Sequence, residues 1–409
     1  MSVGLVWFRR DLRLGDNPAW AAATSDNDAV VALYIIDPGL WERCHPRRIA
    51  QLASHLRALD QSLQERGGRL RIESGDSAEL VSRVTADTGA ERVYLNQDVS
   101  PYARARDDSL TVPVEGFWGG YVHPVGSVRT AANEPYLVFT PFHRAWAATQ
   151  APPWPESGDA AIASFAGEEI PDTMDAEMEG GERAARRRLV EGTARADRYQ
   201  IERDRPDLET TSGLSIDLKW GTLSPRQVIA EIGTHTPSRV ALVRQLAWRE
   251  FYAQLLLAFP ATIDQPLRTE YAHIQWRNDS GEFAAWKSGL TGYPIIDAGM
   301  RQLRASGRMH NRVRLLTASF LVKDLLIDWR WGERWFRRML SDADTAQNVG
   351  NWQWVAGTGA DAAPYFRVFN PILQARRFDP HGAYVRRWVP ELDGLPAHLI
   401  SCPLGIQSS

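Results

Sequence analysis

The first third of the chain alternates short β-rich runs with helical stretches, and this pattern constrains the fold more than any other feature. The β-rich runs cover residues 3–8, 29–36, 69–73 and 92–95, and the helical stretches between them include residues 49–66 and 77–88. Such alternation predicts a parallel, doubly wound sheet with a ligand crevice at the carboxyl ends of its strands. Arg9, Arg10 and Asp11 stand where a nicotinamide-binding fold has its glycine fingerprint, so this part need not hold a nicotinamide cofactor.

A change of composition separates this region from a second, helical one. Pro152, Pro153, Pro155 and Pro171, with clustered glycines and acids between residues 125 and 181, are typical of a linker. Beyond Glu182, leucine, alanine and aromatic residues recur at helical spacing through residues 240–259 and 293–340. We therefore predict an α/β domain over residues 1–125, a linker over 126–182 and an all-α domain over 183–400.

Composition argues against several classes of protein. The only two cysteines, Cys44 and Cys402, have no second ligand nearby, so neither a disulfide framework nor a metal site is expected. No apolar run of about eighteen residues occurs, and the first charges follow an apolar strand, so we expect a cytoplasmic protein without a membrane partner. The net charge is -3, but residues 301–340 hold ten lysines and arginines against three acids, which allows a basic face.

Two features bear on a bound cofactor, and each has an ordinary alternative. The segment from Thr211 to Ser215 offers hydroxyls and backbone N–H groups at a helix start, which can hold a pyrophosphate but can equally be a simple helix cap. The 16 tryptophans lie mostly in the helical half, where core packing is their usual role. Redox chemistry in this chain would need a bound cofactor, because its cysteines form no redox motif.

Ordered sequence motifs connect the chain to a known family. They are WFRRDLR at residues 7–13, GLS at 213–215, WGTLSPR at 220–226, QLAWREFY at 245–252, TGYPIIDAGMRQL at 291–303, MHNR at 309–312, SFLVKDLL at 319–326, NWQW at 351–354 and YFRVFNP at 365–371. In this order they resemble the photolyase/cryptochrome family over nearly the whole chain. The resemblance implies that family's fold: an α/β N-terminal domain with a doubly wound parallel sheet, and an all-α C-terminal domain that binds FAD.

The resemblance also implies which residues hold FAD. Asp342 and Asp344 match positions against the ribose and the isoalloxazine, and Arg314 is expected to pair with Asp342. Asn348 matches the position beside flavin N5, where an amide favours repair and an aspartate would favour a photoreceptor. The implied FAD-binding set is Tyr199, Thr211, Ser212, Gly213, Leu214, Ser215, Arg314, Asp342, Asp344 and Asn348.

Three tryptophans match the residues that carry an electron from the protein surface to photoexcited flavin in this family. They are Trp352, Trp329 and Trp286. Easily oxidised rings at short separations keep each transfer step fast. At these positions the match to the family outweighs the core-packing role, and we expect the three rings to serve photoreduction of FAD rather than repair itself.

A DNA site follows from the same resemblance. The family extrudes the lesion from the duplex into a cavity over the flavin, because stacking would otherwise hide the damaged base. Trp248 and Trp354 match the walls that stack on the flipped dimer, and together with Gln245 and Asn348 they form the implied catalytic set. The implied DNA-binding set is Arg203, Gln245, Trp248, Asn311, Arg312, Leu315, Trp354 and Gln374. The basic excess in residues 301–340 fits phosphate binding.

The implied function is light-driven DNA repair. Photoexcited reduced FAD would donate an electron to a cyclobutane pyrimidine dimer, the ring would split, and the electron would return, as in the carbon–carbon lyases of class I in this family. The partner would be DNA that contains pyrimidine dimers, and the protein is expected to act as a monomer. Residues 98–104 resemble the binders of a deazaflavin or flavin antenna more than those of folate, because Tyr102 and Ala103 replace an Asn-Glu pair.

Two alternatives stay open at this point. Gln245 stands where class I dimer photolyases usually have glutamate, and glutamine is common in (6-4) photolyases and animal-type cryptochromes. The eukaryotic (6-4) enzymes, however, carry two histidines where this chain has Asn311 and Leu315, so their acid chemistry would lack its donor. A cryptochrome-type blue-light photoreceptor usually adds a C-terminal tail, and only about ten residues follow Leu399. We rank both below dimer repair.

Overall fold

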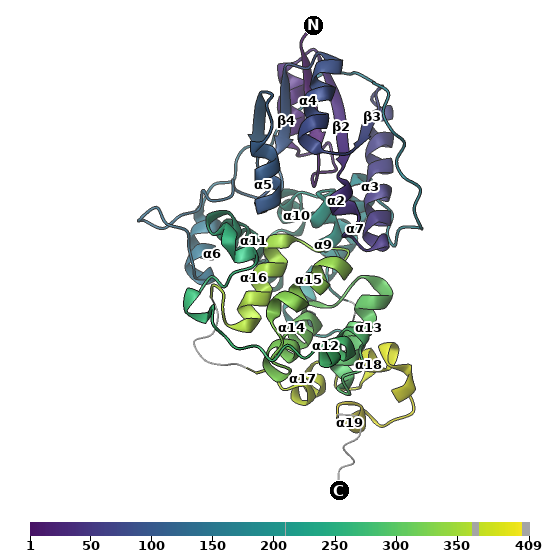
Figure 1. Cartoon of the computed structure of the whole chain (residues 1–409), viewed down its shortest axis with the longest axis vertical. Helices are drawn as coiled ribbons and strands as arrows, with labels where there is room; N and C mark the ends of the chain where they lie inside the picture. Colours follow the sequence, from purple (N-terminus) through teal and green to yellow (C-terminus); the bar gives the residue numbers. More distant parts are fainter. Residues whose placement is uncertain (209, 362–367, 403–409) are drawn as a thin grey trace. The chain divides into compact units, whose positions relative to one another are not determined.

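The computed structural model describes residues 1–208, 210–361 and 368–402, which form two compact units (Figure 1). The first unit comprises residues 1–197 and 212–260, and the second comprises residues 198–211 and the chain from Ala261 onward. Apart from residues 198–211, the chain between Glu182 and Ala258 therefore belongs to the same unit as the sheet, and not to the helical domain as predicted.

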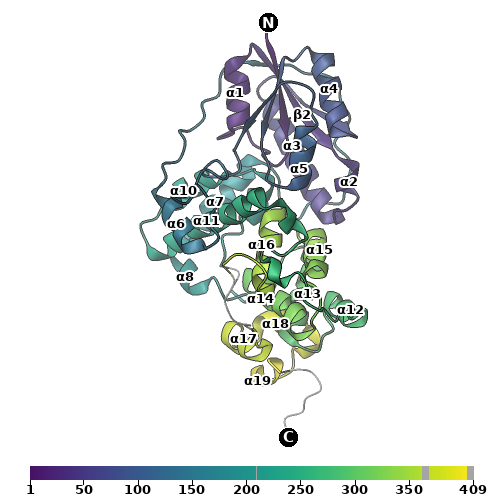
Figure 2. The ribbon, with the colours of Figure 1, turned by 60° about the vertical axis from the view of Figure 1, so that its left-hand side comes forward.

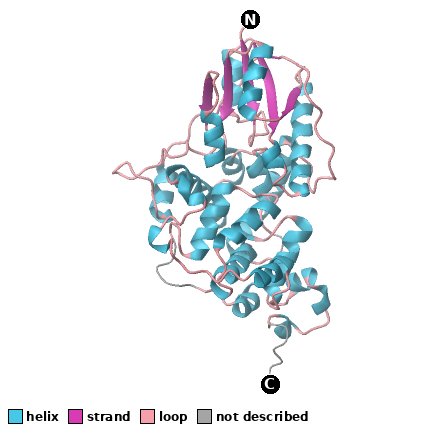
Figure 3. Cartoon of the chain, viewed as in Figure 1, coloured by secondary structure: helices cyan, strands magenta, loops and turns pink. Residues whose placement is uncertain are grey.

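The first unit is built on a parallel sheet in the strand order β3-β2-β1-β4-β5 (Figure 3). The strands are β1 (Val3–Phe8), β2 (Ala29–Ile36), β3 (Leu70–Ser74), β4 (Arg92–Asn96) and β5 (Val114–Phe117), and a short β6 (Ala161–Ile162) pairs with the start of β2. All their pairings are parallel. This confirms the predicted sheet, with strand ends within one residue of those expected for β1 to β4 and with β5 and β6 in addition.

Helices cover both faces of this sheet, because successive side chains along a strand point to opposite faces and both sets are buried. Val6 and Phe8 of β1 pack with α1 (Pro18–Asp26) and α3 (Pro46–Gln64), whereas Leu5 and Trp7 pack with α4 (Ser77–Thr88). Figure 2 shows α1 and α4 on opposite sides of the sheet. The remaining helices of the first unit are α2 (Pro38–Trp41), α5 (Pro101–Asp108), α6 (Phe139–Ala148), α7 (Glu182–Arg195), α9 (Ser215–Trp220), α10 (Pro225–Ile232) and α11 (Pro237–Ala258).

The predicted linker contains regular structure. Helix α6 lies inside it and packs against α11, and β6 extends the sheet. Pro141 lies in the first turn of α6, where a proline is tolerated, and Phe139, Phe142 and Trp146 give α6 a buried face. The proline-rich composition indicated a linker, whereas the spacing of residues 139, 142 and 146 is that of one helix face.

The second unit is helical in the part of the chain that the structure describes. Its α-helices are α8 (Tyr199–Glu202), α12 (Ser280–Ser288), α13 (Pro294–Ser306), α14 (Asn311–Ser319), α15 (Trp329–Met339), α16 (Thr345–Ala356), α17 (Pro371–Phe378), α18 (Ala383–Trp388) and α19 (Ala397–Ile400). A π-helical turn at Phe320–Asp324 follows α14, and short 3-10 turns lie at Pro260–Ile263, Thr269–Tyr271 and Pro390–Leu392. One large apolar core joins α12 to α18 and includes Trp286, Trp329 and Trp352.

Candidate flavin and DNA site

Helix α16 carries most of the predicted chemistry of the second unit. Asp344 caps its N-terminus by accepting a hydrogen bond from the Gln347 amide at 3.1 Å. Asn348 and Trp352 lie four and eight residues beyond the cap, so they share one face of the helix, and both are buried. Trp354 is half-buried, and its indole N–H donates to the carbonyl of Asp361 at 3.1 Å.

The side-chain amide of Asn348 is held in one orientation. Its nitrogen donates to the carbonyl oxygen and to Oε1 of Glu333 on α15, each at 2.9 Å. Burial raises the pKa of Glu333, against the opposing effect of Arg337, which contacts its other oxygen at 2.5 Å. Because both protons of the amide are engaged, Asn348 presents its carbonyl oxygen, an acceptor, to whatever binds beside it.

The predicted pairing of Arg314 with Asp342 is present. The Arg314 guanidinium donates to Asp342 Oδ2 at 2.8 Å, and its Nε donates to the carbonyl of Met309 at 2.8 Å. The Asp342 side chain is only 8% exposed. A charge buried to this degree depends on its partner, so the pair fixes the segment between α15 and α16 against α14.

The predicted pyrophosphate segment has the backbone that such a role needs. Helix α9 begins at Ser215 with Leu214 at its cap position and without a side-chain cap hydrogen bond, so the simple capping role does not apply. Gly213 has a φ of +71°, which favours glycine, and a Cβ built there would meet nothing within 4 Å.

Buried polar atoms of the second unit also fit a polar ligand. Thr210 Oγ1, Glu202 Oε2 and His310 Nε2 are buried and have no hydrogen-bond partner among the described residues. Buried polar atoms are ordinarily satisfied, so such a group calls for an explanation. Burial lowers the pKa of His310 to about 4, against the opposing charge of Asp204, so the imidazole is neutral at pH 7. These residues fit a flavin nucleotide with hydroxyls and a charged pyrophosphate.

The three predicted electron-transfer tryptophans lie in one core. Trp286 and Trp352 have ring centroids 6.3 Å apart, and Phe336 packs against both, at 5.9 and 5.1 Å. Trp329 is buried in the same cluster. The close spacing of Trp286 and Trp352 suits a short transfer step.

Trp286 does not reach the surface, contrary to the expectation that the three rings connect flavin to solvent. It is the one buried residue of the short helix α12 and is 0% exposed, and its indole N–H donates to the carbonyl of Thr317 at 3.0 Å. A route to solvent therefore needs a further group. Phe283 packs between Trp286 and the half-buried Trp331, and the half-buried Trp276 lies against the same core.

In the first unit, α11 carries two residues of the predicted DNA-binding set, Gln245 and Trp248. Trp248 is half-buried and stacks on Phe139 of α6 with ring centroids 3.6 Å apart and planes 7° apart. Tyr252, one turn further, packs against it at 5.5 Å. Gln245 donates from its amide to the carbonyl of Ala241 at 3.0 Å, one turn back on its own helix.

Glu250 ties α11 to its surroundings. It is buried and accepts hydrogen bonds from the backbone amides of Val122 and His123 and from the indole N–H of Trp146, the last at 2.7 Å. Burial raises its pKa to about 7 despite these donors. One carboxyl thereby joins the loop after β5, helix α6 and helix α11.

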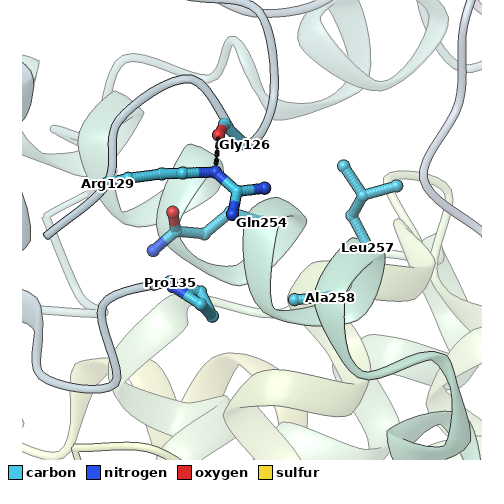
Figure 4. Close-up of a pocket in the computed structure, with 6 residues that line it drawn as sticks. All are labelled: Gly126, Arg129, Pro135, Gln254, Leu257 and Ala258. Carbon is cyan, nitrogen blue, oxygen red and sulfur yellow. Dashed lines mark hydrogen bonds between the residues drawn. The ribbon is translucent and has the colours of Figure 1, made fainter. Parts of the chain in front are cut away.

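A small cavity of the first unit lies at the end of α11 (Figure 4). Its volume is about 110 Å³, and its lining is Gly126, Arg129, Pro135, Gln254, Leu257 and Ala258. Arg129 donates from Nε to the carbonyl of Gly126 at 2.8 Å, as Figure 4 shows. No predicted flavin or DNA residue lines it, and it is well below the size of a cofactor pocket, which is roughly 300 Å³ or more.

The basic excess of residues 301–340 is largely engaged in ion pairs. Five of its ten cations form ion pairs with these acids: Arg301 with Glu391, Arg312 with Asp204, Arg314 with Asp342, Arg330 with Asp328, and Arg337 with Glu333. Arg334 and Arg338 are exposed and form no ion pair with described residues. The segment therefore presents fewer uncompensated charges than its composition indicates.

The other predicted DNA residues of the second unit are accessible to different degrees. Arg203 is half-buried and lies over the ring of Tyr199 at 5.4 Å. Asn311 is exposed at the start of α14, while Leu315 and Gln374 are half-buried. Residues 365–367 of the YFRVFNP motif lie outside the described residues. The predicted sets are thus divided between the two units, with Ser212 to Ser215, Gln245 and Trp248 in the first.

Polar residues gather at the carboxyl ends of the strands, where a doubly wound sheet binds ligands. Arg9, after β1, pairs with Asp107 at 2.6 Å, and Arg10 pairs with Asp98, after β4, at 2.8 Å. Tyr102 is 47% exposed and donates its hydroxyl proton to Asp37, which follows β2. The segment that resembles antenna binders therefore lies at this edge of the sheet.

Sequence reasoning missed three residues of these arrangements. Glu333 orients Asn348 from fifteen residues away, and no local pattern marks it. Glu250 stands inside the QLAWREFY motif, but nothing in the sequence around it marks it as buried. Phe139 could have been found, because residues 139, 142 and 146 have the spacing of one helix face.

No described helix is long and apolar enough to span a membrane. In the described part of the chain, no group of three or more histidine, cysteine or acidic side chains could hold a metal ion.

Comparisons with known proteins bear directly on this site. The family models named DNA photolyase and FAD binding domain of DNA photolyase match residues 4–159 and 242–409. A deoxyribodipyrimidine photo-lyase of Escherichia coli is 39% identical, over 98% of this chain and 92% of its own. A class III photolyase of Agrobacterium tumefaciens is 37% identical with a TM-score of 0.91, covering 100% of this chain and 90% of its own. An archaeal photolyase of Sulfolobus tokodaii, described with two FAD molecules, is 32% identical with a TM-score of 0.89, covering 99% and 95%.

The doubly wound sheet, the helical unit and the matched domains define a flavoprotein with an FAD-binding helical part. The α16 site, with its fixed amide and buried tryptophans, lies inside the matched FAD-binding domain. The chain belongs to the DNA photolyase family.

Proposed function

We propose that this protein repairs ultraviolet-damaged DNA by splitting cyclobutane pyrimidine dimers with blue light and bound FAD. The observation that carries the proposal is the arrangement on α16: the buried Asn348 amide, fixed by Glu333, lies one turn before the buried Trp352. Curated relatives named deoxyribodipyrimidine photo-lyase, about 40% identical over nearly the whole chain, support the assignment.

FAD, when bound, supplies the chemistry: its reduced and light-excited form gives one electron to the dimer and regains it after the two carbon–carbon bonds of the cyclobutane ring break. The chain's own residues bind and orient. Residues 211–215, Arg314, Asp342 and Asp344 would hold the cofactor, with Tyr199 beside them. Asn348 would present its carbonyl oxygen and donate no proton, which favours a reduced ring that keeps its own N–H.

Photoreduction would use the buried tryptophans. Trp352 and Trp286 are close enough for a direct step, and Trp329 lies in the same core. Because none of the three is exposed, we assign the contact with solvent to a half-buried aromatic residue of the same cluster. Repair itself would not require these tryptophans, since the electron returns to the cofactor in each cycle.

DNA would be bound through the predicted wall and backbone residues. Trp248 and Trp354 would stack on the extruded lesion, and Gln245, Asn311 and Leu315 would contact it, as the family resemblance implies. The free energy needed to extrude a nucleotide is lowest where the base is damaged, and this contributes to selectivity for the lesion. Arg203, Arg312 and Gln374 would lie along the backbone, where Arg312 exchanges part of its contact with Asp204 for phosphate.

Gln245 makes the choice of lesion the sharpest test of this proposal. Purified wild type and Gln245→Glu are each given oligonucleotides with one thymine dimer or one (6-4) product, under blue light and in the dark. We expect light-dependent restoration of the dimer substrate by wild type, and an equal or higher rate for Gln245→Glu. Repair of the (6-4) product alone would replace dimer repair as the function. Repair of neither lesion by FAD-loaded protein would favour a cryptochrome-type blue-light photoreceptor.

Four further assignments belong to this proposal. The protein would work as a monomer in the cytoplasm. An antenna, deazaflavin, flavin or folate, would lie at the sheet edge near Asp98 and Tyr102, and the two FAD molecules of the Sulfolobus tokodaii photolyase make a flavin the first candidate to test. Residues 1–125 would bind that antenna, residues 126–182 would connect the two domains, and residues 183–400 would bind FAD.

A further inference from the structure

The stack of Phe139 on Trp248 has a geometry that aromatic pairs seldom adopt without help. Aromatic rings usually meet edge-to-face or offset, with centroids about 4.5 to 7 Å apart, because the π faces repel each other. Here the centroids are 3.6 Å apart and the planes are nearly parallel, at 7°. Phe251 packs its ring against both, at 5.7 and 5.5 Å and nearly perpendicular, and so supports the pair.

A cation accompanies this stack. The Arg244 guanidinium lies over the Phe139 ring, 5.1 Å from its centroid. A positive charge above a ring draws on its π density and offsets the repulsion between stacked faces. Arg244 precedes Trp248 by four residues on α11, so both side chains leave the same face of the helix.

Arg244 is available for a further contact. It is exposed and forms no hydrogen bond or ion pair with any described residue. The acid of the same helix, Glu250, is buried and already accepts from Val122, His123 and Trp146. The imidazole of His143 stacks on Phe139 at 5.6 Å, and burial, with a smaller effect of Arg244, lowers its pKa.

We propose that Phe139 is a positioning residue that holds both Trp248 and Arg244, and that Arg244 binds a DNA phosphate next to the nucleotide that stacks on Trp248. The proposal rests on the proposed function. One ring of α6 would thereby fix a stacking surface and a cation together, before DNA arrives. Pre-organisation of this kind removes the ordering cost of two side chains from the binding step.

The two roles predict different losses. Without the Phe139 ring, Trp248 is free to turn, so stacking on the lesion weakens while contacts with the backbone stay. Without the Arg244 charge, binding weakens for any DNA, because a phosphate contact carries no information about the lesion. Phe142 is the matched control for Phe139: it lies three residues along α6, is equally buried, contacts Phe251, and makes no ring contact with Trp248.

The test measures binding in the dark to an oligonucleotide with one thymine dimer and to its undamaged counterpart, with FAD-loaded protein. For Phe139→Leu we expect about tenfold weaker binding of the dimer and at most about a twofold change for undamaged DNA, in line with the loss of one stacking contact. The repair rate at saturating substrate should stay at the wild-type value, so KM rises while kcat does not. Phe139→Tyr, which keeps the stack, and Phe142→Leu should bind the dimer as wild type does.

For Arg244→Gln we expect equal weakening for both DNAs, with the slope of log affinity against log salt reduced by about one. Loss of dimer binding in Phe142→Leu as large as in Phe139→Leu would overturn the positioning role, and so would wild-type binding by Phe139→Leu. An unchanged salt slope in Arg244→Gln would overturn the phosphate contact. Failure of wild type to repair dimers would instead reject the proposed function, so the two failures are distinguishable.

Discussion

The buried carboxyl of Glu250 is expected to make the stability of the protein depend on pH. Burial raises its pKa from 4.5 to about 7. The folded protein therefore keeps a proton that the unfolded chain releases, so this group's contribution is fully present below pH 4.5 and is lost as the pH rises through 7. At about 1.4 kcal/mol per pH unit between these values, the free energy of unfolding falls by about 3 kcal/mol.

Glu250→Gln removes this titration while keeping the size of the side chain. In urea unfolding followed by circular dichroism, we expect the wild-type free energy of unfolding, relative to that of the variant, to fall by about 3 kcal/mol between pH 4.5 and pH 8. Glu231→Gln, an exposed change on α10, is the control and should show no such trend. A difference between wild type and Glu250→Gln that stays constant over this range would refute the reasoning, because the carboxylate would then be no costlier inside the fold than in water.

Three other changes test the site. Arg314→Met should leave the buried Asp342 charge without its guanidinium and lower the ratio of flavin to protein after purification by about tenfold or more. The control Arg330→Met, which breaks the more local pair with Asp328, should keep the wild-type ratio. Equal flavin content in the two variants would exclude Arg314 from the cofactor site. Trp352→Phe should largely abolish accumulation of reduced flavin under light with a reductant, and unchanged photoreduction would remove the tryptophans from the route. Affinity for DNA should fall steeply with salt, with a slope that counts the phosphates contacted, and a flat dependence would contradict binding through the backbone.

The sheet could be predicted because its signal is local. Strands β1 and β2 are largely apolar runs and β3 and β4 are short segments rich in β-forming residues, and all four lie within one residue of the predicted ends. Their two buried faces follow from the period of two along a strand. The pairing of Arg314 with Asp342 was also predicted, but only through the family resemblance, since 28 residues separate the partners and no local pattern connects them.

Features that depend on tertiary packing could not be predicted. Helix α12 buries a single side chain, so no periodicity shows that Trp286 lies fully inside the core. Glu333 reaches Asn348 only because α15 and α16 pack together. Phe139 lies in a region whose proline-rich composition indicated a linker, although its helix packs on α11 and places its ring against Trp248.

The most direct measurement of the central claim follows one thymine dimer in a short oligonucleotide mixed with FAD-loaded, reduced protein. Under blue light we predict that the dimer is converted to two thymines, in many turnovers per protein molecule, with no conversion in the dark. An intact dimer after illumination, with reduced flavin present and the DNA shown to be bound, would contradict the account.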